Sequence, residues 1–370
     1  MNQTNTPLGL YIHLPFCDGK CPYCDFYSIA ADETVMDAYT ETVCAELAHW
    51  GRELGRPADT LYFGGGTPSL LGEIRLARMA EAARQAFGLN NAEITVEVNP
   101  TRGKGLDFAF LRDAGVSRLS IGLQSAIDRE LRLLGRRHTA QDAAQTVRRA
   151  QEAGFDNISL DLMLAVQEQT LQSLLSSIAF CASLSVQHIS AYLLKVEEGT
   201  PYYQARESLR LPSEDMQCDF YLAACAELKR YGFEQYEISN FSLPGRESRH
   251  NLKYWDGREY LGIGASAHSF LSGKRFYSPR SVENFLSSPQ YLPDGAGGGE
   301  EEYAMLRLRL TEGLTEAGYR NRFGRGIPQS YRARAARFEK NGLLVCDERG
   351  IRFTPQGFLV SNSLTAEVIL

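Results

Sequence analysis

Short apolar runs and longer amphipathic segments alternate through residues 1–200. The short runs are rich in β-branched and aromatic residues, as strands are, and the longer segments carry apolar residues at helical spacing. The predicted strands cover residues 8–14, 60–63, 93–98, 118–123, 158–163 and 186–193. The predicted helices cover residues 35–50, 73–87, 106–114, 140–153 and 171–184. Repeated β-α units of this kind predict an α/β fold, a partial (β/α)6 barrel of the TIM type with its helices outside.

The pattern changes after this first region. Residues 201–287 form a predicted connecting region, with a long helix over 213–231 and an aromatic, glycine-rich stretch over 236–270 that has no clear period. A Pro/Gly/Ser-rich linker is predicted over 288–299. Three predicted helices and a hairpin follow, over residues 300–310, 315–323, 331–341 and 343–353. Helices followed by a hairpin predict a smaller α+β, winged-helix-like domain over residues 288–370.

Composition and charge exclude some classes of protein. The chain has 370 residues, 44% hydrophobic and 23% charged, which are ordinary values for a globular protein. A formal net charge of −6 argues against a nucleic-acid partner, because nucleic-acid binders present a basic surface. The arginines between residues 320 and 337 are better interpreted as a solvated helix face. The leader MNQTNTPLGL is too polar for a signal peptide and no apolar stretch is long enough to cross a bilayer, so we expect a cytoplasmic protein.

The cysteines carry the most specific chemical signal. Cys17, Cys21 and Cys24 lie in one short loop after the first predicted strand, and the other five cysteines are isolated. A reducing compartment keeps thiols free, so a tight cluster indicates metal binding rather than disulfides. A zinc site would need a second cysteine pair or histidines near by, so three-cysteine ligation of a four-iron cluster fits better. Three ligands also leave one coordination position open for chemistry.

Polar and glycine-rich sequences follow the other predicted strands. The loop Gly64–Pro68 follows strand two, Glu97 ends strand three, Gln124 ends strand four, and Asp161 lies on strand five. In barrels and doubly wound sheets, function collects at these carboxyl ends. The glycines let the loop backbone approach a ligand with exposed amides, although a plain tight turn is the alternative. A phosphate loop is disfavoured because the Lys-Ser/Thr ending is missing.

The cysteine spacing is that of the radical S-adenosylmethionine (SAM) superfamily. Read in order, the motifs YIHLPFC, CPYCDFYS, YFGGGTPSLL, EVNP, RLSIGLQS, LGRRH, HISAYLLKVEEGT, HNLKYW and YLGIGASAHS resemble those of oxygen-independent coproporphyrinogen III oxidases and HemW heme chaperones. The resemblance covers nearly the whole chain. It implies a [4Fe-4S] cluster on Cys17, Cys21 and Cys24, with SAM on the fourth iron. One electron from the cluster would then cleave SAM to a 5′-deoxyadenosyl radical.

The same resemblance implies a SAM pocket built from strand ends. Gly65, Gly66 and Thr67 would contact the methionine part of SAM, Arg136 its carboxylate side, and Asp161 the ribose hydroxyls. The other residues implied to line the pocket are Tyr11, Glu97 and Gln124. Family members usually carry Gly-Leu-Pro-Gly-Gln after the strand-five aspartate. Here that loop reads Ala165-Val-Gln-Glu168-Gln169, which changes the backbone angles that the loop can adopt.

Three features place the chain on the heme-chaperone side of this family. The HNxxYW motif, His250 to Trp255, is characteristic of that side and implies His250 as a heme ligand, with His268 a weaker candidate. Phe26 stands where the oxidase has a further cysteine, and the leader before strand one is shorter than in the oxidase. The resemblance thus implies binding of heme and its delivery to acceptor proteins, respiratory proteins being one class, without coproporphyrinogen oxidase activity. It leaves peripheral membrane association and a monomeric or dimeric state open.

Two alternatives remain from the sequence. One is an oxygen-independent coproporphyrinogen III oxidase, or another radical SAM enzyme with a different substrate. The other is a DNA-binding iron–sulfur regulator, which rests only on the C-terminal helices and their arginines.

Overall fold

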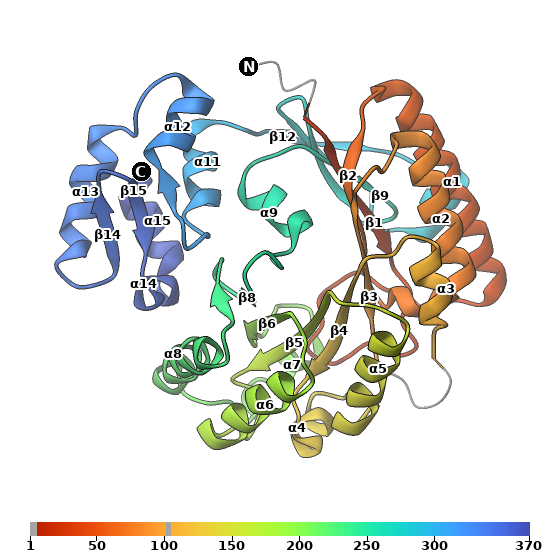
Figure 1. Cartoon of the computed structure of the whole chain (residues 1–370), viewed down its shortest axis with the longest axis horizontal. Coiled ribbons are helices and arrows are strands. Elements are labelled where there is room, and N and C mark those ends of the chain that lie inside the picture. The colour runs from red at the N-terminus through yellow and green to blue at the C-terminus, as the bar shows by residue number, and fades with distance from the viewer. Residues whose placement is uncertain (1–5, 101–104) are drawn as a thin grey trace.

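A single large sheet organises the molecule. The computed structural model describes residues 6–100 and 105–370, and the strands found there form a 12-stranded sheet and a separate 3-stranded sheet. The order in the large sheet is β12-β11-β10-β9-β1-β2-β3-β4-β5-β6-β8-β7. Figure 1 shows this sheet curving round an interior, with helices on its convex side and the C-terminal elements across the opening.

Six parallel strands form the centre of the sheet. They are β1 (Leu8–Leu14), β2 (Ala58–Gly65), β3 (Glu93–Val98), β4 (Arg118–Gln124), β5 (Ile158–Leu164) and β6 (His188–Leu193). The helices between them are α1 (Glu33–Leu54), α2 (Gly72–Phe87), α3 (Phe108–Asp113), α4 (Asp128–Leu133), α5 (Ala140–Glu152) and α6 (Leu171–Ser183), with the 3-10 turn η2 (Pro68–Leu71) before α2. The prediction of a partial β/α barrel is confirmed.

Local signals fix several of these helices. Thr139 and Thr170 form capping boxes at the starts of α5 and α6, so the first backbone amides of each helix are satisfied. Gly55 and Gly88 end α1 and α2 in the left-handed conformation that glycine adopts without a Cβ penalty. These caps define where the helices begin or end, so that the chain after each helix leads into the next strand.

The central strands alternate between an apolar outer face and a polar inner face. On β1, Leu10, Ile12 and Leu14 are completely buried under the helices, whereas Tyr11 and His13 point the other way. The other inner positions are Thr60, Tyr62, Gly64, Thr95, Glu97, Arg118, Ser120, Gly122, Ser159, Asp161, His188, Ser190 and Tyr192. Tyr192 is 41% exposed, so water reaches the inside of the barrel. The polar interior is therefore available for chemistry.

Both edges of the parallel sheet are extended. Strand β9 (Tyr260–Ile263) pairs in parallel with β1, and an antiparallel ribbon follows it. The ribbon strands are β10 (His268–Leu271), β11 (Lys274–Tyr277) and β12 (Leu292–Ala296). At the other edge lie β8 (Asn240–Ser242) and β7 (Glu234–Gln235). The prediction of an irregular linker over 288–299 is wrong for β12, because its pairing with β11 overrides the Pro and Gly composition.

The helices of the connecting region are α7 (Pro201–Gln204), α8 (Glu214–Arg230), α9 (Arg249–Trp255) and α10 (Val282–Ser287). They lie in different places, with α8 packed against α6 and α10 against α1. Ser213 caps α8, since its Oγ accepts a hydrogen bond from Met216 N at 3.3 Å. Figure 1 shows α9 on the concave side of the sheet. No helix of the described residues is both long and apolar enough to span a membrane.

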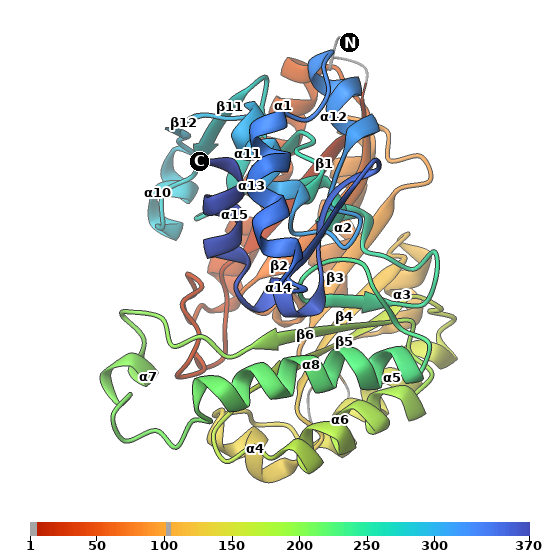
Figure 2. The same ribbon diagram turned by 90° about the vertical axis from the view of Figure 1, so that its left-hand side faces the viewer.

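The C-terminal part has the predicted helices and hairpin. Its elements are α11 (Glu300–Arg307), β13 (Leu314–Thr315), α12 (Glu316–Phe323), α13 (Gln329–Glu339), β14 (Leu344–Asp347), β15 (Gly350–Phe353), α14 (Pro355–Leu359) and α15 (Ser361–Ile369). Figure 2 views the molecule from the side of these helices. Its arginines are held within the fold: Arg332 pairs with Glu316 at 2.7 Å, and Arg334 donates to Val368 O at 2.9 Å. These contacts give both arginines a structural role.

Candidate functional site

The cysteine loop leaves the carboxyl end of β1 and is closed at its base. Cys17 N donates to Ile29 O at 3.0 Å, and Ile29 N donates to Pro15 O at 2.8 Å. Inside the loop, Cys24 N donates to Cys21 O at 3.1 Å, which turns the chain back on itself. The loop thus stands at the carboxyl ends of the strands, called here the mouth of the barrel, as the sequence predicts.

The three thiols of the loop lie near enough to one another to interact electrostatically. All three are free and half-buried. Burial raises the pKa of Cys24, and nearby Cys21 and Cys17 raise it further. Among the described residues no three His, Cys, Asp or Glu side chains are close enough to hold a single metal ion. Three thiolates are a donor set that a four-iron cluster uses, whereas a structural zinc site takes four Cys or His ligands.

The GGGTP loop packs against the cysteine loop. Gly66 N donates to Leu14 O at 3.0 Å, Thr67 N donates to Phe16 O at 2.8 Å, and Gly65 N donates to Glu97 Oε2 at 3.2 Å. A Cβ on Gly66 would lie 2.7 Å from Phe16 O. Glycine is therefore required for close packing of two backbones, and the expectation of amides exposed to a ligand is wrong. The loop can still present carbonyl oxygens and the Thr67 hydroxyl.

A chain of polar contacts links Cys17 to Cys21 of the cysteine loop. Thr67 Oγ1 lies 3.5 Å from Cys17 Sγ and accepts from Asn99 Nδ2 at 2.9 Å. Arg136 Nη2 donates to Asn99 Oδ1 at 2.7 Å, and Arg136 Nη1 lies 3.7 Å from Cys21 Sγ. Sequence reasoning left Asn99 unassigned, although its place directly after β3 was a usable signal. The guanidinium therefore places a positive charge beside the sulfur of Cys21.

A cavity of about 320 Å³ opens beside this chain. Its wall includes Cys21, Thr67, Asn99 and Arg136. A Cβ on Gly122 would lie 3.0 Å from Gln124 Nε2, 3.1 Å from Asn99 Oδ1 and 3.2 Å from Arg136 Nη2, so these three side chains converge on one spot. The cavity therefore joins the cysteine loop to the ends of β2, β3 and β4, and a ligand there would meet hydroxyl, amide and guanidinium groups together.

Three more predicted residues lie deeper in the barrel. Glu97 accepts from Tyr62 OH at 2.9 Å, and desolvation inside the barrel raises its pKa to about 7. Asp161 accepts from Ser120 Oγ at 3.2 Å, and its pKa is also raised by burial. The Tyr11 hydroxyl lies 2.9 Å from His13 Nδ1. These side chains share the interior with the cavity but lie below it, along the inward rows of β1, β3 and β5.

Sequence reasoning missed Arg118. This arginine begins β4 on the polar, inward phase of the strand and is only 2% exposed. Its positive charge lowers the pKa of both Glu97 and Asp161, against the larger effect of their burial. The alternation Arg118, Ser120, Gly122 on an otherwise apolar strand was the signal that could have found it.

His250 lies at the other end of the barrel. Its ring is 1% exposed, Nδ1 is 2.9 Å from Thr60 Oγ1, and Nε2 is 2.8 Å from Tyr254 OH. Its backbone amide donates to Glu93, the first residue of β3, so α9 covers the amino ends of the strands, called here the floor. Burial lowers the pKa of His250 to about 3. With both nitrogens engaged, this geometry gives His250 a structural role.

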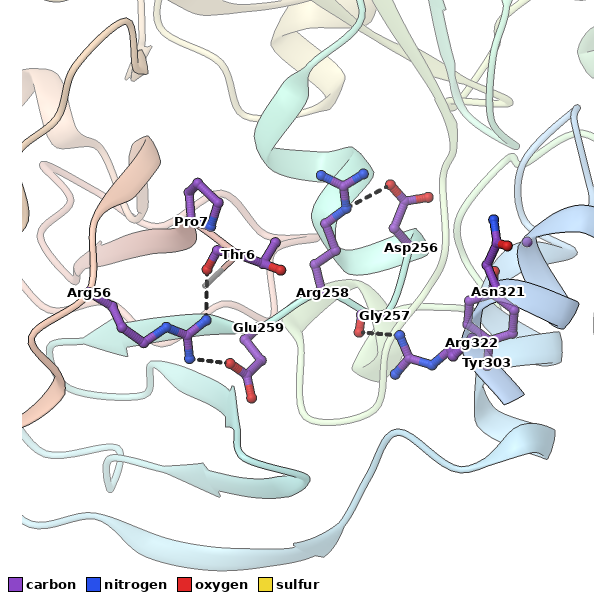
Figure 3. A pocket seen from close by; sticks show the side chains of 11 residues that line it. Thr6, Pro7, Arg56, Asp256, Gly257, Arg258, Glu259, Tyr303, Asn321 and Arg322 are labelled. Atoms are coloured by element: carbon purple, nitrogen blue, oxygen red, sulfur yellow. Dashed lines mark hydrogen bonds and ion pairs between the residues drawn. The ribbon is translucent and has the colours of Figure 1, made fainter. Parts of the chain in front are cut away.

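A cavity of about 450 Å³ lies near the floor, between β9 and the C-terminal helices (Figure 3). Its charged walls are largely paired: Arg56 binds Glu259, Arg258 Nε lies 3.3 Å from Asp256, and Arg322 donates to Gly257 O at 3.2 Å. Arg322 also lies over the Tyr303 ring. The contact of Arg322 with Gly257 joins the C-terminal part to the barrel. The cavity therefore lies at the boundary between them.

Known proteins match the chain closely. A profile of the Radical SAM superfamily matches residues 11–181, and one of the HemN C-terminal domain matches residues 301–360. The heme chaperone HemW of Lactococcus lactis is 34% identical over 376 residues, covering 98% of each chain. The HemW of Bacillus subtilis is 33% identical, covering 96% of this chain and 97% of its own. The chain belongs to the HemW family of heme chaperones.

The fold extends beyond the HemW family. The coproporphyrinogen III oxidase HemN from Escherichia coli is a radical SAM enzyme. Its solved structure superposes on this chain with a TM-score of 0.83. It is 23% identical and covers 99% of this chain and 91% of its own. At that identity the likeness establishes a shared fold and not a shared reaction.

The loop after β5 keeps an unusual backbone. Ala165 and Glu168 stand where the family resemblance implies glycine, and both have positive φ, 61° and 58°. Gln169 holds the loop, since its Oε1 accepts from Ala165 N at 2.6 Å and its Nε2 donates to Met163 O at 3.2 Å. The glycine conformation is thus retained by residues that adopt it at a cost of about 1 kcal/mol each.

Proposed function

We propose that this protein binds heme and delivers it to acceptor proteins, on a scaffold that carries a [4Fe-4S] cluster and SAM. The observation that carries the proposal is the match to proteins named heme chaperones over nearly the whole chain. Phe26 supports it, because it replaces the oxidase cysteine and its ring is 62% exposed at the mouth. An exposed aromatic ring suits contact with a flat, largely apolar ligand.

Cys17, Cys21 and Cys24 would hold the cluster. SAM would occupy the neighbouring cavity, with Arg136 at its carboxylate and with carbonyls of Gly65 and Gly66 and the Thr67 hydroxyl at its methionine part. Tyr11, Glu97, Gln124 and Asp161 would complete the pocket. When bound, the pair supplies one-electron reductive cleavage of SAM. The residues themselves would orient the ligand beside the cysteine loop.

The second candidate is an oxygen-independent oxidase or another radical SAM enzyme. Glu97 favours it, because a carboxyl with a pKa of about 7 inside a polar barrel can accept or donate a proton near neutral pH. The test is product analysis under reducing conditions. Formation of 5′-deoxyadenosine together with decarboxylation of coproporphyrinogen would favour the oxidase.

The proposal also covers the domain boundaries, the cellular location and the partners. We place a radical SAM core at residues 1–200, a connecting region at 201–287 and a C-terminal domain at 288–370. The cytoplasm is the proposed location, supported by cysteines that are all free. Heme-accepting proteins, respiratory ones included, are the proposed partners.

Anaerobic reconstitution followed by hemin titration tests the function. A heme chaperone gives one saturable hemin site and passes the hemin to an apo-acceptor. Absence of saturable binding, combined with turnover of coproporphyrinogen, would favour the second candidate. Cys218→Ala is a matched control for the cluster cysteines, because Cys218 is also half-buried but isolated from the loop.

A further inference from the structure

An exposed histidine lies at the mouth. His268 begins β10, directly after the loop that leaves the carboxyl end of β9, and its side chain is 59% exposed. Burial chiefly lowers the pKa of His13 near the end of β1, and Arg280 and His268 lie close enough to lower it further. His268 and Arg280 therefore lie beside the strand from which the cysteine loop departs.

The strand register turns His268 toward the barrel interior. Tyr11 pairs with Gly262, so Tyr260, two residues earlier, is on the same inward face. Phe270 pairs with Tyr260, and His268 is two residues before Phe270. His268 consequently faces the same space as the SAM-pocket residues, from the opposite edge of the opening.

The surroundings of His268 suit an iron-bound imidazole. Its ring stacks on Tyr277, with ring centroids 5.4 Å apart and planes 23° from parallel. Asp294 Oδ2 lies 3.6 Å from Nδ1. Metal-ligating histidines commonly have a carboxylate on the nitrogen that does not bind the metal, which fixes the ring and makes the ligating nitrogen more basic. Nε2 is the nitrogen on the far side of the ring from Asp294.

Apolar and cationic groups of the ribbon, the Arg280 segment and the cysteine loop also lie at the mouth. Tyr277 pairs with Leu292, which is 39% exposed on the same face of the ribbon. The Tyr27 hydroxyl accepts from Val282 N at 3.2 Å, which ties the cysteine loop to the segment carrying Arg280. Phe26 is the neighbour of Tyr27 and is 62% exposed. We call His268, Tyr277, Leu292, Asp294, Arg280 and Phe26 the mouth surface.

We propose that heme binds on the mouth surface, with His268 Nε2 as an axial ligand of the iron and Arg280 paired with a propionate. This inference rests on the proposed heme-binding function. An imidazole can serve as an axial ligand, apolar side chains suit the macrocycle, and a cation can pair with a propionate. His250 offers none of them to the solvent, because its nitrogens bind Thr60 and Tyr254.

Hemin titration of matched variants tests the inference. His268→Ala should weaken hemin binding by about tenfold or more and move the Soret band, and imidazole added to the buffer should restore the band position. His49→Ala is the control, since His49 is also exposed and lies 5.7 Å from an aromatic ring, but on α1 outside the barrel. It should match the wild type. Arg280→Ala should weaken binding several-fold, with Arg280→Lys retaining part of the affinity.

The titration results separate failure of the proposed function from failure of the mouth-surface assignment. If wild type shows no saturable hemin site, the proposed function fails. If wild type binds hemin but His268→Ala keeps the same affinity and Soret band, the function stands and the mouth-surface assignment is overturned. Loss of the Soret band in His250→Ala, with an unchanged circular dichroism spectrum and an unaffected His268→Ala protein, would also overturn it and return the ligand to α9.

Discussion

The mouth and the floor of the barrel each carry a histidine from a family motif, and their environments are opposite. His250 on the floor is 1% exposed, with both nitrogens engaged. His268 at the mouth is 59% exposed, with a carboxylate near one nitrogen. A motif therefore identifies a residue that the family keeps, whereas burial and hydrogen bonding decide whether its chemistry can reach a ligand.

The largest predicted effect is at the mouth. Cys21→Ala should abolish the broad visible absorbance and the bound iron of the reconstituted protein, because two thiolates do not hold a four-iron cluster. Iron analysis and absorbance measure the loss. Cys218→Ala should retain both, and a cluster that persists in Cys21→Ala would show that the ligand assignment is wrong.

Removing the floor histidine should chiefly reduce stability. His250→Ala should lower the free energy of unfolding by about 3 kcal/mol, because it leaves a cavity and two buried hydroxyl partners unpaired. Chemical denaturation measures the change. His268→Ala, with its exposed ring, should stay within about 0.5 kcal/mol of wild type. Equal losses in the two variants would contradict the contrast between floor and mouth.

The loop after β5, at the mouth, has a strained backbone that substitutions at Ala165 can test. Ala165 has a φ of 61° and is 2% exposed, so a β-branched side chain fits neither the conformation nor the space. Ala165→Val should cost roughly 3 kcal/mol in unfolding free energy, whereas Ala165→Gly should change it by less than about 1 kcal/mol. A well-tolerated valine would mean that the loop has a different backbone.

The floor should also respond to pH. Burial depresses the pKa of folded His250 to about 3, so between pH 6.5 and 3 the unfolded chain takes up a proton that the folded protein refuses. This part of the stability is complete above pH 6.5 and is lost as the pH falls through that window. His250→Gln should reduce the slope of unfolding free energy against pH by about 1 kcal/mol per unit near pH 5. An unchanged slope would mean that folded His250 is already protonated.

The sequence predicted the central strands well because their apolar outer faces are continuous and local. β1 and β3 begin and end where the periodicity places them. It did not predict β9 to β12, because these short strands owe their conformation to pairing with β1 and with one another. Tertiary pairing of this kind leaves little periodic trace in a stretch rich in glycine and aromatics.

The candidate site shows the same division. Spacing alone brought Cys17, Cys21 and Cys24 into one loop, strand order brought Thr67 to the same mouth, and the family resemblance added Arg136. The roles of individual groups needed coordinates. The GGGTP glycines serve backbone packing, Asn99 bridges Thr67 to Arg136, and His250 is sealed by partners distant in sequence. Such long-range contacts cannot be read from local patterns.

The most direct test of the central claim is hemin titration of the anaerobically reconstituted wild-type protein, followed by mixing with an apo-heme protein. We predict one saturable hemin site, transfer of that hemin to the acceptor, and no decarboxylation of coproporphyrinogen. Absence of a saturable site, with decarboxylation and release of 5′-deoxyadenosine, would contradict the assignment as a heme chaperone.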